Sequence, residues 1–259
     1  MEFSLRILAA GLSLFVAACA GLPANPAADA ASGASTSQAD YPATAWSDGW
    51  KHHTLPGKES TEYSVARVDG REAMAARAVS SASLMRQRVN IPAADLDSVK
   101  FSWKVPALIA QADLAARDNA DSTVRIVLAF EGDRSKFSMK NSMLSELSLA
   151  ITGEPLPYAT LMYVWCNSRE AGSVITSSRT DRIRKIVVES GAKNLNSWID
   201  YERNIRADYE KAFGEPPGAL VGIGIMTDSD NTRSTTQAWY GPGKLTGKAM
   251  NVAVATPPR

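Results

Sequence analysis

Apolar and polar residues alternate along much of the chain, in short stretches separated by turn-forming residues. This period of two is typical of β-strands with one buried face, because successive side chains of a strand point to opposite sides. Residues 99–105 show it most clearly, with Val99, Phe101, Trp103 and Val105 on one face. The same reading predicts strands at 63–68, 73–79, 84–89, 123–130, 159–166, 173–176 and 183–189, and two more within 220–241.

One stretch inside a long insertion changes to helical spacing. Met143, Leu144, Leu147 and Ile151 recur at intervals of three or four residues, which predicts a short helix at 142–151. The segment Gly153-Glu154-Pro155 contains the residues that commonly end a helix.

A second helix is predicted between Ser197 and Gly214. Ser197 and Asp200 resemble a capping box, although Asp replaces the usual Glu or Gln. Trp198, Ile205 and Tyr209 then share one helical face, and Gly214 stands where a C-cap glycine belongs.

These elements predict an all-β protein. About ten short strands with one or two short α-helices favour a jelly-roll-like antiparallel β-sandwich, in which two sheets share one core. Asp69-Gly70, between two alternating stretches, predicts a two-residue hairpin turn. Residues 123–130 are apolar on both faces, which indicates a strand inside a sheet. The strands are not separated by regular helices, which argues against a parallel α/β sheet.

The first nineteen residues read as a secretory signal peptide. Arg6 precedes an apolar run that is too short to cross a membrane, and small residues follow. Val16-Ala17-Ala18-Cys19 resembles the lipobox of bacterial lipoproteins, in which Cys19 becomes the lipidated first residue. Cleavage after Ala20 as an ordinary signal peptide is the alternative. The resemblance implies a lipid-anchored protein of the cell envelope facing the periplasm, and Ala20 after the cysteine favours the outer membrane.

The rest of the chain divides into two parts. Residues 20–45 are rich in Ala, Pro, Ser and Gly and predict a flexible tether. Residues 46–259 predict a single sandwich domain, since a hydrophobic content of 45% supports one sizeable core. A net charge of +1 argues against a nucleic-acid partner, which requires a basic surface.

The few cysteine and histidine residues do not indicate a metal site or a nucleophilic catalytic site. With Cys19 in the lipobox, Cys166 alone remains, within an apolar run, and it is expected to be a buried apolar residue. His52 and His53 are adjacent and have no metal-ligand motif near them, so no metal site is predicted there. Acyl transfer through a Ser-His-Asp set is improbable for the same lack of histidine.

Several motifs in order resemble one bacterial family. They are Trp103-Lys104-Val105, Ala112-Asp113, the acidic loop 118–121 before 124–130, Leu161-Met162-Tyr163-Val164-Trp165, the segment 202–209 with Phe213-Gly214-Glu215, and Thr227-Asp228-Ser229-Asp230-Asn231-Thr232. Together they resemble the DUF3047 family, a domain of unknown function, over roughly residues 45–245. Cys166 stands where that pattern has glycine, and the loop 118–121 lacks an adjacent Asp pair. The family is also similar in fold to jelly-roll carbohydrate-binding modules, and the resemblance implies no reaction.

The polar loop at 228–232 is the first candidate site. Asp228, Asp230 and Asn231 offer oxygen atoms that could bind a ligand or hold calcium, although the EF-hand pattern is absent. Alternatively their side chains bond the backbone of the loop and shape the turn. Arg203 is expected to pair with Asp228 or Asp230 and so tie the second helix to the final hairpin. Binding of a ligand is the alternative role for Arg203.

Two further sets of residues bear on a saccharide ligand. Trp165 and Trp239 each end a strand beside a polar loop, so we expect their rings to be exposed for stacking on sugars, whereas most other aromatic residues belong to the core. Asp113 and Asp121 are weaker candidates. With Asp228 and Asp230 they supply enough carboxyl groups for a glycosidase pair, although their spacing does not show that any two converge.

Three hypotheses about function remain open. The first is an envelope-anchored β-sandwich without catalytic residues that binds a saccharide or another envelope component. The second is a glycan hydrolase or lyase with paired carboxylates. The third is a structural lipoprotein whose acidic loops only stabilise the fold. No cofactor is predicted apart from the open alternative of calcium.

Overall fold

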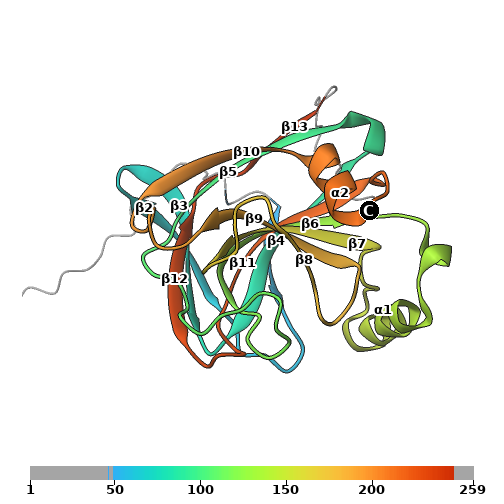
Figure 1. Ribbon diagram of the computed structural model, residues 1–259, viewed down its shortest axis with the longest axis horizontal. Coiled ribbons are helices and arrows are strands. Elements are labelled where there is room, and N and C mark those ends of the chain that lie inside the picture. The colour runs from blue at the N-terminus through green and yellow to red at the C-terminus, as the bar shows by residue number, and fades with distance from the viewer. Residues whose placement is uncertain (1–45, 47–48, 248–259) are drawn as a thin grey trace, which may run out of the picture. The chain divides into compact units, whose positions relative to one another are not determined.

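Strands are the predominant regular elements among the described residues, which are Trp46 and residues 49–247. In the computed structural model they pair into two sheets that pack face to face (Figure 1). Sheet A has seven strands in the order β1-β4-β11-β6-β7-β9-β8, and sheet B has the order β10-β5-β12-β3-β2 with β13 also paired to β5. The predicted signal peptide, Cys19 and tether lie outside the described residues.

The bounds of the elements follow. The strands of sheet A are β1 (Trp50–Thr54), β4 (Ala82–Ile91), β6 (Ser122–Phe130), β7 (Ala159–Cys166), β8 (Val174–Thr176), β9 (Ile183–Ser190) and β11 (Leu220–Asp228). Those of sheet B are β2 (Glu62–Val68), β3 (Arg71–Val79), β5 (Leu96–Lys104), β10 (Trp198–Asn204), β12 (Thr235–Tyr240) and β13 (Lys244–Gly247). The α-helices are α1 (Met139–Thr152) and α2 (Ile205–Phe213), with 3-10 turns at Ala93–Asp95 and Arg134–Lys136.

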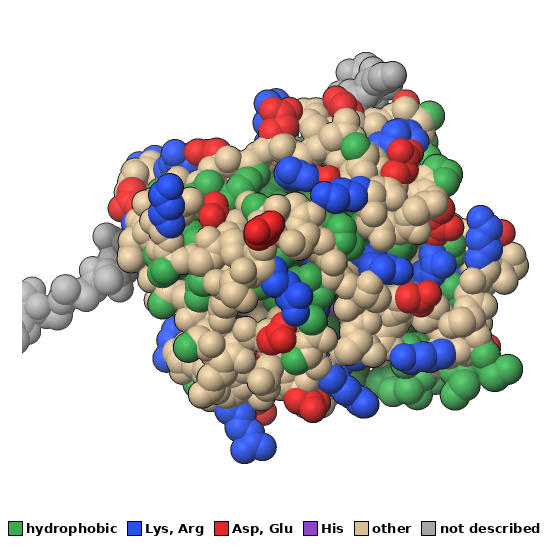
Figure 2. All heavy atoms as spheres, in the orientation of Figure 1, with side chains coloured by type: hydrophobic (Ala, Val, Ile, Leu, Met, Phe, Trp, Pro, Cys, Tyr) green, Lys and Arg blue, Asp and Glu red, His purple; other side chains and the backbone are tan. Residues whose placement is uncertain are grey.

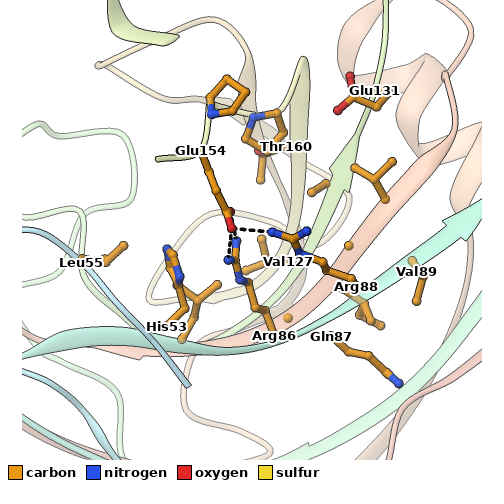
Figure 3. Close-up of a pocket in the computed structure, with 18 of the residues that line it drawn as sticks. His53, Leu55, Arg86, Gln87, Arg88, Val89, Val127, Glu131, Glu154 and Thr160 are labelled. Carbon is orange, nitrogen blue, oxygen red and sulfur yellow. Dashed lines mark hydrogen bonds and ion pairs between the residues drawn. The ribbon is translucent and has the colours of Figure 1, made fainter. Parts of the chain in front are cut away.

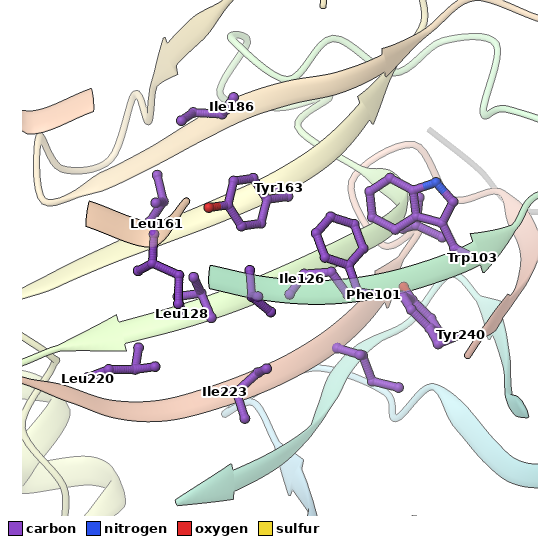
Figure 4. Packing of buried hydrophobic residues seen from close by; sticks show 14 of the residues in the cluster. Phe101, Trp103, Ile126, Leu128, Leu161, Tyr163, Ile186, Leu220, Ile223 and Tyr240 are labelled. Atoms are coloured by element: carbon purple, nitrogen blue, oxygen red, sulfur yellow. The ribbon is translucent and has the colours of Figure 1, made fainter. Parts of the chain in front are cut away.

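The all-β sandwich with short helices is therefore confirmed. The core lies between the sheets, where the alternating face of β5 meets β6 and β7 (Figure 4). Val99, Phe101 and Trp103 are buried as the alternation predicted, and Phe101 stacks on Tyr163 of the opposite sheet with ring centroids 5.5 Å apart. Residues 123–130 form β6, which pairs with β11 on one side and β7 on the other, so it is an interior strand as expected.

Two local predictions are also confirmed. Asp69 and Gly70 have φ of 52° and 77°, the positive values that a two-residue hairpin turn between β2 and β3 requires. The helix expected at 142–151 is α1, which begins slightly earlier because Ser138 caps it by accepting a hydrogen bond from the Asn141 amide. Gly153 ends it with φ of 75°.

The predicted start of the second helix is wrong. Residues 198–204 form β10, which pairs with β5 over its whole length, and α2 begins only at Ile205. Asn204 is the true N-cap, since its side chain accepts a hydrogen bond from the Ala207 amide, and Gly214 is the C-cap as predicted. Ser197 and Asp200 matched a capping pattern, but residues 198–204 take their hydrogen-bond partners from β5 instead.

The sandwich departs from a purely antiparallel arrangement at one place. β7 and β9 pair in parallel, and β8 lies between them in sequence but outside β9 in the sheet. No helix within the described residues is long and apolar enough to span a lipid bilayer.

The outer face of sheet A, which points away from the core, is covered unevenly. Leu114 from the loop between β5 and β6 packs on Val164, Ile175 and Val187, and these residues form a small second apolar cluster with Cys166. Cys166 is thus buried as predicted, at 5% exposure. The part of this face nearer to β1 and α1 is left open, and it forms the site described next.

Candidate functional site: a charged groove on sheet A

The loop after β11, the first candidate from the sequence, is held by hydrogen bonds within the protein. Asp228 is buried, its Oδ1 accepts from the Ser122 amide at 2.9 Å, and its Oδ2 lies 2.9 Å from Arg125 Nη2. Burial raises the pKa of the Asp228 carboxyl to about 6, and the charge of Arg125 opposes that rise. This pair ties β11 to β6 across sheet A.

Asp121 fixes the turn that follows. Its carboxylate is fully buried and accepts hydrogen bonds from the amides of Asn231 and Thr232, at 3.2 and 2.7 Å, and from the Thr232 hydroxyl at 2.6 Å. Asn231 therefore contributes its backbone amide to the turn. Asp230 forms an ion pair with Lys58.

The three carboxyl groups of Asp121, Asp228 and Asp230 do converge, with candidate ligand atoms within 4.8 Å of one another. Such a group could hold a hard cation. However, each carboxylate already has an N–H, hydroxyl or cationic partner, and the cavity beside Asp121 measures only about 10 Å³. The arrangement supports turn shaping, and it leaves no cleft in which these acids could reach a glycosidic bond.

The expected pairing of Arg203 with Asp228 or Asp230 is wrong. Arg203 binds Asp208 with two hydrogen bonds, Nε to Oδ2 at 2.8 Å and Nη2 to Oδ1 at 2.6 Å. Tyr163 donates its hydroxyl to the same carboxylate at 3.0 Å. Asp208 lies only five residues from Arg203, on the first turn of α2, so the arginine ties the end of β10 to the helix that follows it.

The two tryptophans that were expected to be exposed differ in burial. Trp165 is 2% exposed, and its indole N–H donates to the Gly191 carbonyl at 2.9 Å, so the prediction of an exposed ring is wrong. Its side chain faces the core because it continues the inward alternation of β7. Trp239 is partly exposed on β12, with Lys104 Nζ 5.9 Å from its ring centroid.

Asp113 stands apart from the other acids. Its Oδ1 accepts a hydrogen bond from the Ala115 amide at 3.0 Å and lies 3.4 Å from Arg169 Nη2. The Ala115 amide, followed by Arg169, lowers the pKa of this exposed carboxyl. The structure thus joins Asp121, Asp228 and Asp230, and it gives Asp113 and Arg203 other partners. Trp165 lines the small cavity beside Asp121.

A groove that the sequence did not single out lies on the open part of the outer face of sheet A. Its volume is about 510 Å³, within the usual range for small-molecule sites. The strand register produces it. One row across the sheet contains Arg86, Gly224 and Val127, and the next row contains Arg88, Gly222 and Ala129.

Two glycines of β11 deepen this groove, because they place no side chain on its floor. A Cβ at Gly224 would lie 3.1 Å from the Met85 carbonyl oxygen, and one at Gly222 would lie 3.5 Å from the Ala129 Cβ. Without these side chains the backbone of β11 is open between the arginines of β4 and the apolar residues of β6. The alternating glycines of β11 and the alternating arginines of β4 are the sequence features that could have predicted this site.

The wall of the groove carries a shared ion pair (Figure 3). Arg86 donates to both oxygens of Glu154, at 2.8 and 2.9 Å, and Arg88 Nη2 lies 2.5 Å from Glu154 Oε1. These guanidinium groups, Arg86 foremost, hold the pKa of Glu154 below its usual range. Glu154 is therefore ionised at neutral pH, which suits a counter-ion and not a general acid.

The other charged residues of the groove leave it slightly cationic. Arg134 and Glu131 form a loose pair at 3.7 Å. Burial and the charge of Arg86 lower the pKa of His53, so its imidazole is neutral at pH 7. Three arginines thus face two glutamates. None of the described residues that line the groove is Trp, Tyr or Phe.

Comparison with known families identifies the family of the chain. The family described as "Protein of unknown function (DUF3047)" matches residues 48–242. The chain belongs to the DUF3047 family. The motif resemblance in the sequence is thereby confirmed, and the DUF3047 match covers nearly all of the described sandwich. Comparison with curated proteins gives no match.

The solved structures that are similar to this DUF3047 protein include the following two. One is the family 11 carbohydrate-binding module of the cellulosomal cellulase Lic26A-Cel5E of Clostridium thermocellum, with 10% identity, a TM-score of 0.37, and coverage of 77% of this chain and 88% of that one. The other is the xyloglucanase domain of NopAA, a type three effector from Sinorhizobium fredii in complex with cellobiose, with 10% identity, a TM-score of 0.40, and coverage of 78% and 95%.

Proposed function

We propose that this protein is an envelope-anchored binding protein that takes an anionic saccharide of the cell envelope in the groove on sheet A. The observation that carries the proposal is the pair of arginines, Arg86 and Arg88, which stand side by side above a glycine floor and share one carboxylate, Glu154. A planar guanidinium donates two parallel hydrogen bonds to a carboxylate or a phosphate. Glu154 occupies the position that such a ligand group would take.

The depth and lining of the groove support a ligand of modest size. Val127, Ala129 and the backbone of β11 form an apolar floor on which the carbon face of a sugar could rest. Without an aromatic platform in the lining, stacking contributes little, and the arginines must supply most of the affinity. This favours acidic over neutral sugars.

Anchoring at the envelope is the second part of the proposal. It rests on the predicted signal peptide and on the resemblance of residues 16–19 to a lipobox, and it includes the outer membrane as the destination. A saccharide ligand would then be met on the periplasmic side, where envelope glycans carry carboxylate and phosphate groups.

Calorimetric titration with trigalacturonic acid and with neutral maltotriose tests the groove. We expect the acidic sugar to bind, and Arg88→Gln to weaken that binding about tenfold or more, since a charge-assisted hydrogen bond contributes roughly 1.5–3 kcal/mol. Arg88 is 77% exposed, so its removal should not affect folding. Arg77→Gln, an exposed arginine of β3 at 3.5 Å from Glu62, is the matched control and should bind as the wild type does.

A second variant is expected to raise the affinity for the acidic sugar. Glu154→Gln removes the internal competitor of the ligand, so the acidic sugar should bind more tightly, provided that the groove keeps its shape. Equal binding of both sugars, or weaker binding in Glu154→Gln with an unchanged melting temperature, would contradict the proposal.

A further inference from the structure

Helix α1 is inverted with respect to the usual amphipathic helix. Asn141 and Ser145 are buried against the body of the protein, whereas five of the large apolar side chains point to solvent. Met139 is 83% exposed, and the others are Met143 at 63%, Leu147 at 56%, Leu149 at 50% and Ile151 at 59%. A surface helix normally turns its apolar side to the core.

Polar contacts hold the helix in this orientation. Asn141 Nδ2 donates to Asp181 Oδ1 at 2.7 Å, and Thr180 Oγ1 donates to Asn141 Oδ1 at 2.7 Å. Arg134 Nη1 donates to the Ser145 hydroxyl at 3.1 Å. The inward face of α1 is thus fixed by hydrogen bonds, and its apolar face is left outward.

The exposed side chains lie together on the surface. Met139, Met143, Leu147 and Ile151 recur every four residues, which places them in one stripe along the helix. Figure 2 shows a group of apolar side chains where Figure 1 places α1. Lys136 and Lys140, both exposed, stand at the N-terminal end of the stripe. Apolar side chains with lysines beside them are typical of helices that lie in a membrane interface.

We propose that α1 lies on the membrane to which the chain is anchored, with its apolar stripe in the lipid interface and the groove beside the membrane surface. This inference rests on the anchoring part of the proposed function. A lipid at Cys19 would leave residues 20–45 between membrane and sandwich, a length of up to about 90 Å when extended. Such a length exceeds the width of the domain, about 40 Å for a chain of this size. The anchor alone therefore does not determine which face of the domain contacts the membrane, whereas the apolar stripe on α1 does.

A second copy of the chain fits this face less well. The 14 residues of α1 span about 21 Å, so one helix face offers a few hundred Å². A stable dimer buries about 1,200–2,000 Å² in total. A membrane has no such minimum when an anchor already holds the protein at its surface, because the contact only needs to orient it.

The orientation has a consequence for the groove. Glu154 follows directly after the end of α1 at Thr152 and the C-cap Gly153, and Ser148 Oγ donates to the Glu154 carbonyl at 2.9 Å. Docking of α1 would place Arg86 and Arg88 within reach of the polar layer of the membrane. The ligand of the groove would then be an acidic saccharide at the membrane surface.

The test uses the full lipidated chain in vesicles of phosphatidylethanolamine and phosphatidylglycerol that contain a doxyl-labelled lipid as quencher. Met143→Cys carries an environment-sensitive fluorophore on the stripe. Val65→Cys, also an exposed apolar position at 46% exposure but on β2 of sheet B, is the matched control. We expect the label at 143 to be quenched about twofold or more relative to the label at 65. Leu147→Glu in the labelled Met143→Cys chain should abolish that difference.

Each other outcome overturns the inference. Equal quenching at both positions means that the anchored domain has no preferred face. A blue shift at 143 that grows with protein concentration without vesicles means that a second copy covers the stripe. If the chain does not sediment with vesicles, it is not anchored, and both the anchoring proposal and this inference fail. The sugar titration needs no vesicles, so it tests binding in the groove independently.

Discussion

Lys185 is buried on the outer face of sheet A in the same row as Arg86, Gly224 and Val127, but beneath the loop between β5 and β6. Its Nζ donates to the Leu114 carbonyl at 2.6 Å. Burial, followed by the nearby charge of Arg125, lowers the pKa of Lys185 to about 8. A cation with a depressed pKa costs stability whenever it is charged, so it opposes folding at neutral pH.

The first prediction concerns this lysine. Between pH 8 and about 10.5 the unfolded chain binds a proton that the folded chain has released, so the free energy of unfolding rises with pH there by up to roughly 3 kcal/mol. Lys185→Met removes the charge and one hydrogen bond, and should raise the free energy of unfolding by about 2 kcal/mol at pH 7. Urea unfolding at pH 7 and pH 10.5 measures both; identical pH dependence of the two proteins would contradict it.

The second prediction compares two carboxylates of the same loop. Asp228→Asn leaves the guanidinium of Arg125, whose side chain is only 7% exposed, buried without its counter-ion, and should lower the free energy of unfolding by about 3 kcal/mol or more. Asp230→Asn breaks a pair with Lys58, which is 33% exposed and can turn to water, and should cost about 1 kcal/mol or less. Equal losses in chemical denaturation would show that the two pairs do not differ in burial as described.

At the scale of elements, the sequence predicted those strands and helix ends that depend on neighbouring residues in the chain. Residues 123–130 became an interior strand because apolar side chains on both faces fit no other position. Gly214 and Gly153 ended their helices because a positive φ favours glycine. These features depend on a few neighbouring residues, and so one sequence is sufficient to find them.

The features that were predicted wrongly or missed depend on contacts between segments that are distant in the sequence. Arg203 had acidic residues on both sides in the sequence, and only the pairing of β10 with β5 shows that Asp208 is the partner it reaches. Residues 198–204 fit a helix locally, but the register with β5 decided in favour of a strand. The groove was missed because β4, β11 and β6, far apart in sequence, form it only when aligned side by side.

The attachment of α1 gives the third prediction. Asn141→Ala removes two hydrogen bonds of 2.7 Å and leaves Thr180 and Asp181 without these partners, so the helix should detach more often. Amide hydrogen exchange across residues 139–152 should accelerate by about tenfold, which corresponds to roughly 1.4 kcal/mol. Glu146→Ala, an exposed change on the same helix, is the control and should leave exchange unaltered. Acceleration spread evenly over the sandwich would show that α1 does not open on its own.

For the molecule as a whole, the fourth prediction concerns the proposed lipid anchor at Cys19, because the proposed orientation of the groove depends on it. The chain has two cysteines, and Cys166 is buried at 5% exposure between β7 and its neighbours, so it is a poor substrate for acylation. Labelling of growing cells with radioactive palmitate should therefore mark the wild type and Cys166→Ser equally, and Cys19→Ser not at all. Cys19→Ser should also leave the membrane fraction, since the apolar stripe on α1 is too small to hold the protein alone. If Cys19→Ser stays membrane-bound without label, the signal segment is retained or α1 binds more strongly than its area implies, and fluorescence quenching at Met143→Cys in that variant separates these two cases.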